Sequence, residues 1–261
     1  MQVSVFASGS SGNCLLASDP GANVLIDAGI SLRRIREALS ESGHSIQKLD
    51  GVLVTHEHSD HISGLKMLVK YHHVPVYAPR TVASRLLGML PELDGCLRVI
   101  PVGEGFDVGS LRVTAFHTPH DTDESVGYRL AGEGVFALAT DMGRVTDEVR
   151  EALLGADTVL IESNHDEEML RYGPYPVYLK RRILSAHGHL SNADCAVLAR
   201  LLAENGTRRI ILGHLSRENN RPELALAAAR SALAGLETEL CCAPMSGCLT
   251  VPVERTSLCC R

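Results

Sequence analysis

The residues DGVLVTHEHSDH, from Asp50 to His61, contain the strongest pattern in the sequence. The first half, DGVLVT, is an apolar run rich in β-branched residues and predicts a buried strand. The second half places three histidines and one aspartate in the loop that leaves this strand. Such a loop can direct alternate side chains to one point, so His56 and His58 are expected to share one metal ion. Asp60 and His61 would face a second ion, unless the segment is only a polar turn rich in histidine.

Three further residues with metal-binding side chains follow apolar strands elsewhere. They are His120 in FHTPHD, Asp141 in FALATDMG and His214 in IILGHLS. Imidazole and carboxylate groups without thiolate suit zinc, manganese or iron at an open catalytic site, because a structural zinc site favours cysteine. Any one of them alone would be an ordinary polar residue, but their shared position after a strand makes them candidate ligands. His117 competes with His120, and the TPHD context favours His120.

The composition is that of a globular protein of 261 residues, with 45% hydrophobic and 21% charged residues and a net charge of −6. Its 12 histidines are about twice the number that average usage would give. No signal peptide or long apolar stretch is present in the sequence, which predicts a cytoplasmic protein with no membrane span. The eight cysteines form no CxxC pair and are expected to be free thiols in a reducing compartment.

Hydrophobic periodicity predicts strands and helices along the whole chain. Strands are expected at 2–7, 14–18, 23–29, 50–55, 74–78, 97–100, 111–118, 125–132, 134–141, 157–163, 208–214, 236–242 and 248–253, with a hairpin at 103–109. Helices are expected at 31–42, 62–71, 80–90, 145–155, 166–173, 176–185, 191–206 and 221–235. Pro75 in VPVYA at 74–78, and Pro79 directly after it, suit an edge strand. Two β-rich layers accompanied by helices predict a mixed α/β sandwich, and the absence of a linker predicts one domain over residues 1–261.

The motif THEHSDH, followed by TPHD, a strand-ending aspartate and a late histidine, resembles the metallo-β-lactamase superfamily. The resemblance implies an αββα four-layer sandwich, in agreement with the predicted layers. It implies that one metal ion is held by His56, His58 and His120, a second by Asp60, His61 and His214, and that Asp141 bridges them. Asp27 in NVLIDAG matches an early aspartate that orients a ligand. True β-lactamases carry cysteine where Asp141 stands, so hydrolysis of antibiotics is not expected.

A closer resemblance, to the WalJ (YycJ) group of this superfamily, runs along nearly the whole chain. It is carried by FASGSSGN, LIDAGIS, VTHEHSDHISG, ATDMG, IESNHDEEML, GHLSN and LGHLSRENNRPELA. Proteins of this group are regarded as metal-dependent DNA exonucleases with a link to mismatch repair. The resemblance therefore implies a phosphodiesterase with two divalent ions, DNA as its substrate and repair proteins as partners.

The same resemblance suggests roles for residues around the metal ions. Asp60 would orient a bridging hydroxide for attack on phosphorus, and His189 in GHLSN would donate a proton to the leaving oxygen. Glu162 would position His189, while Asn164 and His165 would contact the phosphate or a ligand. The basic residues Lys180, Arg181, Arg182 and Arg217 would follow the nucleic-acid backbone, or else form a solvated helix face. The tyrosines Tyr172, Tyr175 and Tyr178 would stack on bases or pack on the core.

Three other functions compete with this interpretation. An RNA-processing nuclease would use the same residues, and nothing in the sequence identifies a group that reads a 2′-hydroxyl. A thioesterase or lactonase would share the THxHxDH ligand set but has no obvious use for GHLSN, NHD or the basic run. A metal-binding module without catalysis would not need His189 and Glu162 beside a complete ligand set.

Overall fold

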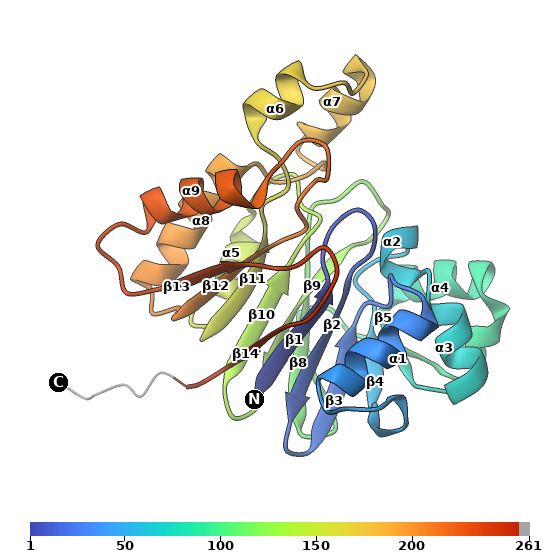
Figure 1. Ribbon diagram of the computed structural model, residues 1–261. Helices are drawn as coiled ribbons and strands as arrows, with labels where there is room; N and C mark the ends of the chain where they lie inside the picture. The colour runs from blue at the N-terminus through green and yellow to red at the C-terminus, as the bar shows by residue number, and fades with distance from the viewer. Residues whose placement is uncertain (256–261) are drawn as a thin grey trace.

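Two seven-stranded sheets pack face to face, and helices cover their outer faces (Figure 1). The computed structural model describes residues 1–255. The first sheet contains, in spatial order, β14 (Leu249–Pro252), β1 (Gln2–Ala7), β2 (Cys14–Asp19), β3 (Ala22–Ile26), β4 (Gly51–Leu53), β5 (Val76–Pro79) and β6 (Leu97–Ile100). The second contains β13 (Glu239–Cys242), β12 (Arg209–Gly213), β11 (Thr158–Glu162), β10 (Val135–Ala139), β9 (Val126–Ala131), β8 (Leu111–His117) and β7 (Gly105–Val108). This layering confirms the predicted αββα sandwich.

Each sheet has its own layer of helices. The apolar faces of α1 (Leu32–Glu41), α3 (Leu65–His72) and α4 (Arg80–Met89) pack on the first sheet. Those of α5 (Asp147–Leu153), α8 (Asn192–Glu204) and α9 (Pro222–Ala232) pack on the second. Two single-turn 3₁₀ helices, η1 (Ile46–Lys48) and η2 (Pro91–Leu93), lie in the connections of the first half. Each amphipathic helix therefore buries its apolar stripe against a sheet.

The space between the sheets is filled by side chains from both inner faces. Tyr128 and Phe136, from β9 and β10, are fully buried there. Burying each such side chain contributes about 1.5–3 kcal/mol. The Tyr128 hydroxyl donates a 2.7 Å hydrogen bond to the carbonyl oxygen of Val54, the residue after β4. This bond satisfies a buried polar group and joins the second sheet to the start of the histidine-rich loop.

Both sheets change from antiparallel to parallel pairing part-way across. Strands β3 to β6 are parallel in the first sheet, and β10 to β13 are parallel in the second. The carboxyl ends of parallel strands meet at one edge, so the loops that follow them gather at one end of the sandwich. The short helix α2 (Ser59–Ile62) starts within one of these loops. Two more short helices, α6 (Glu167–Tyr172) and α7 (Val177–Ile183), project above this end (Figure 1).

The predicted elements are confirmed, with three corrections. Residues 103–109 do not form a hairpin of their own, because β7 is a single strand that pairs antiparallel with β8. The strand predicted at 74–78 is not an edge strand, because β5 pairs with both β4 and β6. Its prolines are tolerated because Pro75 precedes the strand and Pro79 is its last residue and the N-cap of α4. The helix predicted from residue 62 begins at Leu65, after α2 and Gly64.

Six cysteines lie in the described part of the chain, and all six are free thiols, as predicted. Cys259 and Cys260, for which the same was predicted, lie outside the described residues. Over residues 1–255, no helix has both the length and the apolar character that crossing a membrane requires.

Candidate metal centre

The seven histidines and aspartates predicted as metal ligands lie together at the end of the sandwich where the parallel strands finish. They form overlapping groups whose donor atoms lie within 4.8 Å of one another. Three such groups are His56, His58 and His120; His56, His61 and Asp141; and Asp60, His61 and His214. A fourth joins Asp141 and His214 to Glu162 and His189. The donors therefore form one continuous cluster supplied by loops of both sheets.

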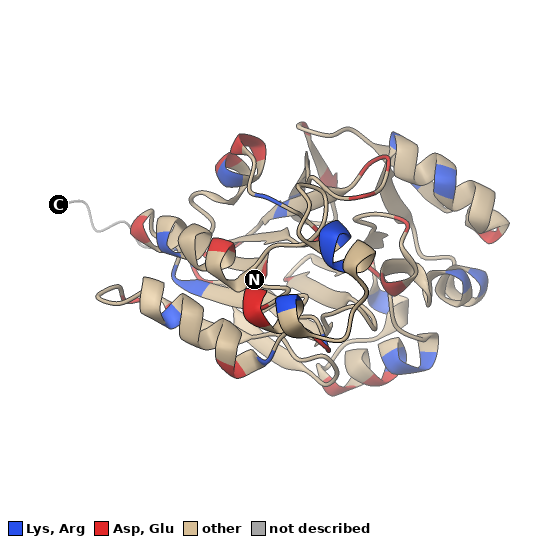
Figure 2. Ribbon diagram, turned by 90° about the horizontal axis from the view of Figure 1, so that it is seen from above, with Lys and Arg blue, Asp and Glu red and all other residues tan. Residues whose placement is uncertain are grey.

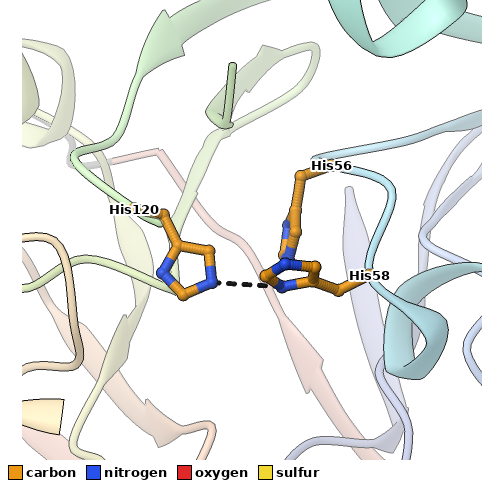
Figure 3. A group of neighbouring side chains, drawn as sticks. All are labelled: His56, His58 and His120. Atoms are coloured by element: carbon orange, nitrogen blue, oxygen red, sulfur yellow. Dashed lines mark hydrogen bonds between the residues drawn. The ribbon is translucent and has the colours of Figure 1, made fainter. Parts of the chain in front are cut away.

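The first group consists of three imidazole rings that face one another (Figure 3). His58 Nδ1 and His120 Nε2 are 3.3 Å apart, and the ring centroids of His56 lie 4.6 Å from His58 and 5.0 Å from His120. His56 comes from the loop after β4 and His120 from the loop after β8, so the two sheets contribute to the same group. His56 Nε2 is buried and has no hydrogen-bond partner among the described residues.

The second group combines an aspartate with two histidines. Asp60 Oδ2 lies 3.4 Å from His61 Nε2 and 3.6 Å from His214 Nε2. Asp141 stands beside both rings, with Oδ2 3.4 Å from His61 Nε2 and Oδ1 3.5 Å from His214 Nδ1. Asp141 Oδ1 is also 3.8 Å from His120 Nε2, so this carboxylate faces both groups.

Backbone conformation turns three of the site residues toward this cluster. Asp27, Asp141 and His214 have φ angles of 58°, 56° and 52°. Each follows β3, β10 or β12 within two residues, so the chain reverses directly after the strand. A left-handed conformation is unfavourable for residues other than glycine, at about 1–3 kcal/mol each, and it concentrates at functional sites. Here it directs side chains into the cluster.

Asp27 and Thr55 fix the orientation of two of the histidines. Asp27 Oδ2 lies 2.7 Å from His61 Nδ1 and accepts a 2.9 Å hydrogen bond from the Thr55 hydroxyl. Because the Thr55 hydrogen points to Asp27, its oxygen is free to accept from His56 Nδ1, 3.1 Å away. With Nδ1 donating, Nε2 of each ring carries the lone pair and faces the cluster, the arrangement typical of metal-bound histidine.

Glu162 orients His214 as Asp27 orients His61, and it also contacts His189. Its fully buried Oε1 lies 2.9 Å from His214 Nδ1 and 2.7 Å from His189 Nδ1. Its other oxygen, Oε2, accepts a 2.9 Å hydrogen bond from the Met142 backbone N–H. Burial alone raises the pKa of Glu162, but the adjacent His189 and His214 outweigh it and hold the pKa below its usual value. Glu162 is therefore an anion that can orient both rings at once.

The pKa directions divide the cluster into two electrostatic environments. Burial and the nearby His61 and His120 lower the pKa of His56 well below its usual value. Burial also lowers the pKa of His61, but Asp27 and Asp141 outweigh it and raise the pKa to about 10. The carboxylate-rich half of the cluster thus stabilises positive charge, and the His56 ring in the imidazole-rich half favours the neutral form with an available lone pair.

Comparison with known proteins agrees with this geometry. Residues 22–215 match the family model described as a beta-lactamase superfamily domain. The exodeoxyribonuclease YycJ of Bacillus anthracis is 38% identical over 229 residues, 86% of each chain. The exodeoxyribonuclease WalJ of Streptococcus pneumoniae is 39% identical over 226 residues, 85% of this chain and 84% of its own. The chain belongs to the metallo-β-lactamase superfamily.

Within this superfamily the chain is a member of the YycJ/WalJ group, as the sequence predicts, and it is a hydrolase. A solved structure, the metallo-β-lactamase fold protein YhfI of Bacillus subtilis, superposes with a TM-score of 0.73. Its identity is 17%, with 95% of this chain and 98% of YhfI covered, so it shows the shared fold.

The structure separates His120 from its competitor His117. His120 is buried in the donor cluster. The His117 side chain, in contrast, is 53% exposed at the end of β8 and lies beside Glu148 and Glu124. The geometry therefore agrees with the choice of His120.

The other residues predicted to contact substrate differ in their surroundings. Asn164 Nδ2 donates a 2.9 Å hydrogen bond to the His214 carbonyl oxygen, so it lies beside the cluster. His165 is 1% exposed, and both its ring nitrogens lack partners among the described residues, so its ring does not face solvent. Lys180 donates two 2.8 Å hydrogen bonds to the carbonyl oxygens of Arg171 and Gly173 and fixes the turn between α6 and α7.

The remaining basic residues lie on the surface near the cluster. Arg182 is paired with Asp121, and Arg181 and Arg217 are exposed. Basic and acidic residues are interspersed along the ribbon, as Figure 2 shows. Lys180, Arg181 and Arg182 form the basic last turn of α7, and Glu167 and Glu168 form the acidic first turn of α6.

One residue of the site was missed by the sequence interpretation. Asn13 Nδ2 lies 3.2 Å from Asp60 Oδ2 and 3.0 Å from His61 Nε2, and Asn13 Oδ1 accepts a 2.9 Å hydrogen bond from the Gly9 backbone N–H. SGSSGN enters the sequence interpretation only as part of FASGSSGN, with no role for Asn13. The asparagine at the end of this glycine- and serine-rich stretch was the available signal.

Proposed function

We propose that this chain is a metal-dependent exodeoxyribonuclease that hydrolyses phosphodiester bonds of DNA and acts in DNA repair in the cytoplasm. The observation that carries the proposal is the Glu162 carboxylate, in which one oxygen, Oε1, contacts both His214 in the donor cluster and the partly exposed His189. A candidate proton donor is thereby held beside the candidate metal ligands. The printed names of the two relatives at 38% and 39% identity support DNA as the substrate.

The donor set fits divalent metal ions. His56 Nε2, His214 Nε2 and Asp141 Oδ2 are buried and have no hydrogen-bond partner among the described residues. An unsatisfied buried polar atom costs about 1–3 kcal/mol, and a cation at the centre of the cluster would satisfy these atoms together. The donors are nitrogen and oxygen with no thiolate, which suits zinc, manganese or iron.

We assign two ions to this cluster. His56, His58 and His120 would hold one, Asp60, His61 and His214 would hold the other, and Asp141, which faces both groups, would contact both. Bound divalent ions would lower the pKa of a water molecule and neutralise charge on the phosphate oxygens. Asp27 and Glu162 would keep the His61 and His214 rings in the tautomer that binds metal.

The chain's own residues would then move the protons of the hydrolysis. Asp60 would orient the attacking water, which loses one proton to solvent and adds to phosphorus as the bond from phosphorus to the leaving oxygen breaks. His189 would give its proton to that oxygen. Burial lowers the pKa of His189, but Glu162 outweighs it and raises the pKa above its usual value, which favours the protonated ring that a proton donor needs. The side chain is 23% exposed, so a substrate can reach it.

The test is digestion of end-labelled single- and double-stranded DNA by purified protein, with manganese or zinc added and metal content measured by elemental analysis. We expect stepwise shortening of DNA from one end. The same assay on RNA, a thioester and a lactone distinguishes the rival functions. Rapid hydrolysis of one of these, with DNA left intact, would overturn the proposal.

A further inference from the structure

A pocket of about 240 Å³ lies beside the candidate metal centre, under α7. His189 and Asn164 line it. Asp121 also lines it, and its Oδ1 lies 3.3 Å from His120 Nε2. A molecule in this pocket would therefore be in contact with the residues that surround the scissile bond.

One wall of the pocket is apolar and includes an aromatic ring. Tyr175, Leu179 and Ile183 line it, and their spacing of four residues places them on one side of α7 and of the turn before it. Tyr175 is half-buried against the pocket. Tyr178 is not among the lining residues and is 74% exposed. The structure thus distinguishes two tyrosines that the sequence leaves equivalent.

The remaining lining residues, apart from Gly188, are polar or charged. Ser10, Ser216 and Asn164 are neutral and can form hydrogen bonds. Arg182 is the one guanidinium or ammonium group among the described lining residues, and it is already paired with Asp121. The pocket is therefore better suited to a neutral polar group than to an additional phosphate.

A flat apolar surface facing hydrogen-bond donors and acceptors is the chemistry that recognises a nucleobase, which stacks through its face and forms hydrogen bonds through its edge. The volume, about 240 Å³, is below the range of roughly 300–1,000 Å³ for drug-sized ligands, which suits one base better than two.

We propose, on the basis of the nuclease function above, that this pocket receives the base of the one nucleotide being removed from the end of the strand. Tyr175 stacks on that base, and Asn164, Ser10 and Ser216 face its edge. The limited volume then accounts for removal of one nucleotide at a time, because only a strand end can place its last base under α7.

Binding to the metal-loaded protein tests the role of Tyr175. The probes are deoxyadenosine monophosphate and 2-deoxyribose 5-phosphate, which share a phosphate and a sugar but differ in the base. We expect Tyr175→Ala to weaken binding of the nucleotide about tenfold, as expected for loss of one stacked base, and to leave the sugar phosphate unchanged. Tyr175→Phe should retain nucleotide binding, because it keeps the ring. Tyr178→Ala is the matched control and should bind both probes as the unchanged protein does.

An equal loss for both probes in Tyr175→Ala, or an equal loss in Tyr178→Ala, would overturn the assignment. Hydrolysis assays separate this outcome from failure of the proposed function. If the unchanged protein shortens DNA and Tyr175→Ala shows the same KM, the pocket assignment is wrong and the nuclease function stands. If the unchanged protein hydrolyses neither DNA nor bis(p-nitrophenyl) phosphate, the proposed function fails, and the assignment with it.

Discussion

At the scale of single residues, His189 and His214 differ in what they can contact beyond Glu162. His214 is 1% exposed and its free nitrogen faces Asp60, whereas His189 lines the pocket under α7. The same carboxylate oxygen therefore orients one ring toward the metal cluster and the other toward the substrate. This difference makes the two roles separable by substitution.

His189→Ala should lower turnover on DNA by about 10²- to 10⁴-fold, the usual contribution of a positioned proton donor. Metal content, measured by elemental analysis, should stay unchanged because the six side chains assigned to the ions and Asp141 are intact. His187→Ala is the control, since His187 is exposed and lies two residues away. Loss of metal from His189→Ala would instead reassign the ring as a ligand.

Asp27→Asn should reduce metal affinity about 10- to 100-fold, the usual effect of removing a carboxylate that supports a metal-bound histidine. An amide offers one acceptor oxygen, whereas the Asp27 carboxylate contacts both His61 Nδ1 and the Thr55 hydroxyl and backbone N–H. Competition with a chromophoric chelator measures the change. Asp107→Asn, at a 66% exposed side chain on β7, should have no effect, and equal affinities for the two variants would contradict the role of Asp27.

Sequence reasoning was effective for residues whose type alone carries chemistry. The motif THEHSDH, with His120, Asp141 and His214, is brought together as expected. It was less effective for Asn13, whose contact with Asp60 depends on how a glycine-rich turn folds over the loop. The left-handed conformations of Asp141 and His214 also have no sequence signal, because glycine is the residue that usually indicates them.

At the scale of elements, the site depends on how closely the turn after β3 approaches the start of α2. A Cβ atom added at Gly29 would lie 1.6 Å from the Asp60 carbonyl oxygen. The Gly29 backbone N–H also donates a 2.8 Å hydrogen bond to the Asn13 carbonyl oxygen. A side chain at residue 29 would therefore displace the backbone that carries Asp60.

Gly29→Ala should lower the free energy of unfolding by at least about 1–3 kcal/mol, as overpacking does, and should also reduce metal content. Gly88→Ala is the matched control. An added Cβ there meets no atom within 4 Å, and Gly88 lies within α4, so alanine should raise the free energy of unfolding by about 0.5–1 kcal/mol. Urea denaturation of both variants checks the prediction, and equal midpoints would contradict it.

The elements themselves were predictable because periodicity reports which side of a segment is buried. The spacing of Ile35 and Leu39 in α1, for example, places both on the buried face. Strand order depends on how all strands of a sheet pair, so the periodicity of a single segment does not predict it. The prolines near β5 suggested an edge, yet Pro75 contributes its carbonyl oxygen to the sheet by accepting from the Val52 backbone N–H. The backbone N–H that proline lacks weakens a sheet only where a carbonyl oxygen of the neighbouring strand needs that donor.

At the scale of the whole molecule, the candidate centre joins the two sheets. His56, His58, Asp60 and His61 come from the first, and His120, Asp141 and His214 come from the second. The sheets are also joined through their apolar interface and the hydrogen bond from Tyr128 to Val54. Metal ions bound between them would therefore stabilise the folded state over the unfolded state.

Removal of metal by a chelator should lower the melting temperature without loss of the fold. Ions present at about 100 times their Kd contribute about 2.7 kcal/mol, which corresponds to roughly 5–10 °C for a chain of this size. Thermal melting with and without chelator measures the shift, and readdition of zinc or manganese should reverse it. Identical melting temperatures would contradict metal binding at this interface.

The shared carboxylate of Glu162 also determines which variant is useful for capturing a complex with DNA. A substitution at Glu162 acts on two functions at once, since it releases His214 as well as His189. A protein inactivated there would lose both catalysis and the intact ligand geometry. Crystallisation of a bound, uncleaved strand is therefore best attempted with His189→Ala, which slows the reaction and leaves the contacts of His214 in place.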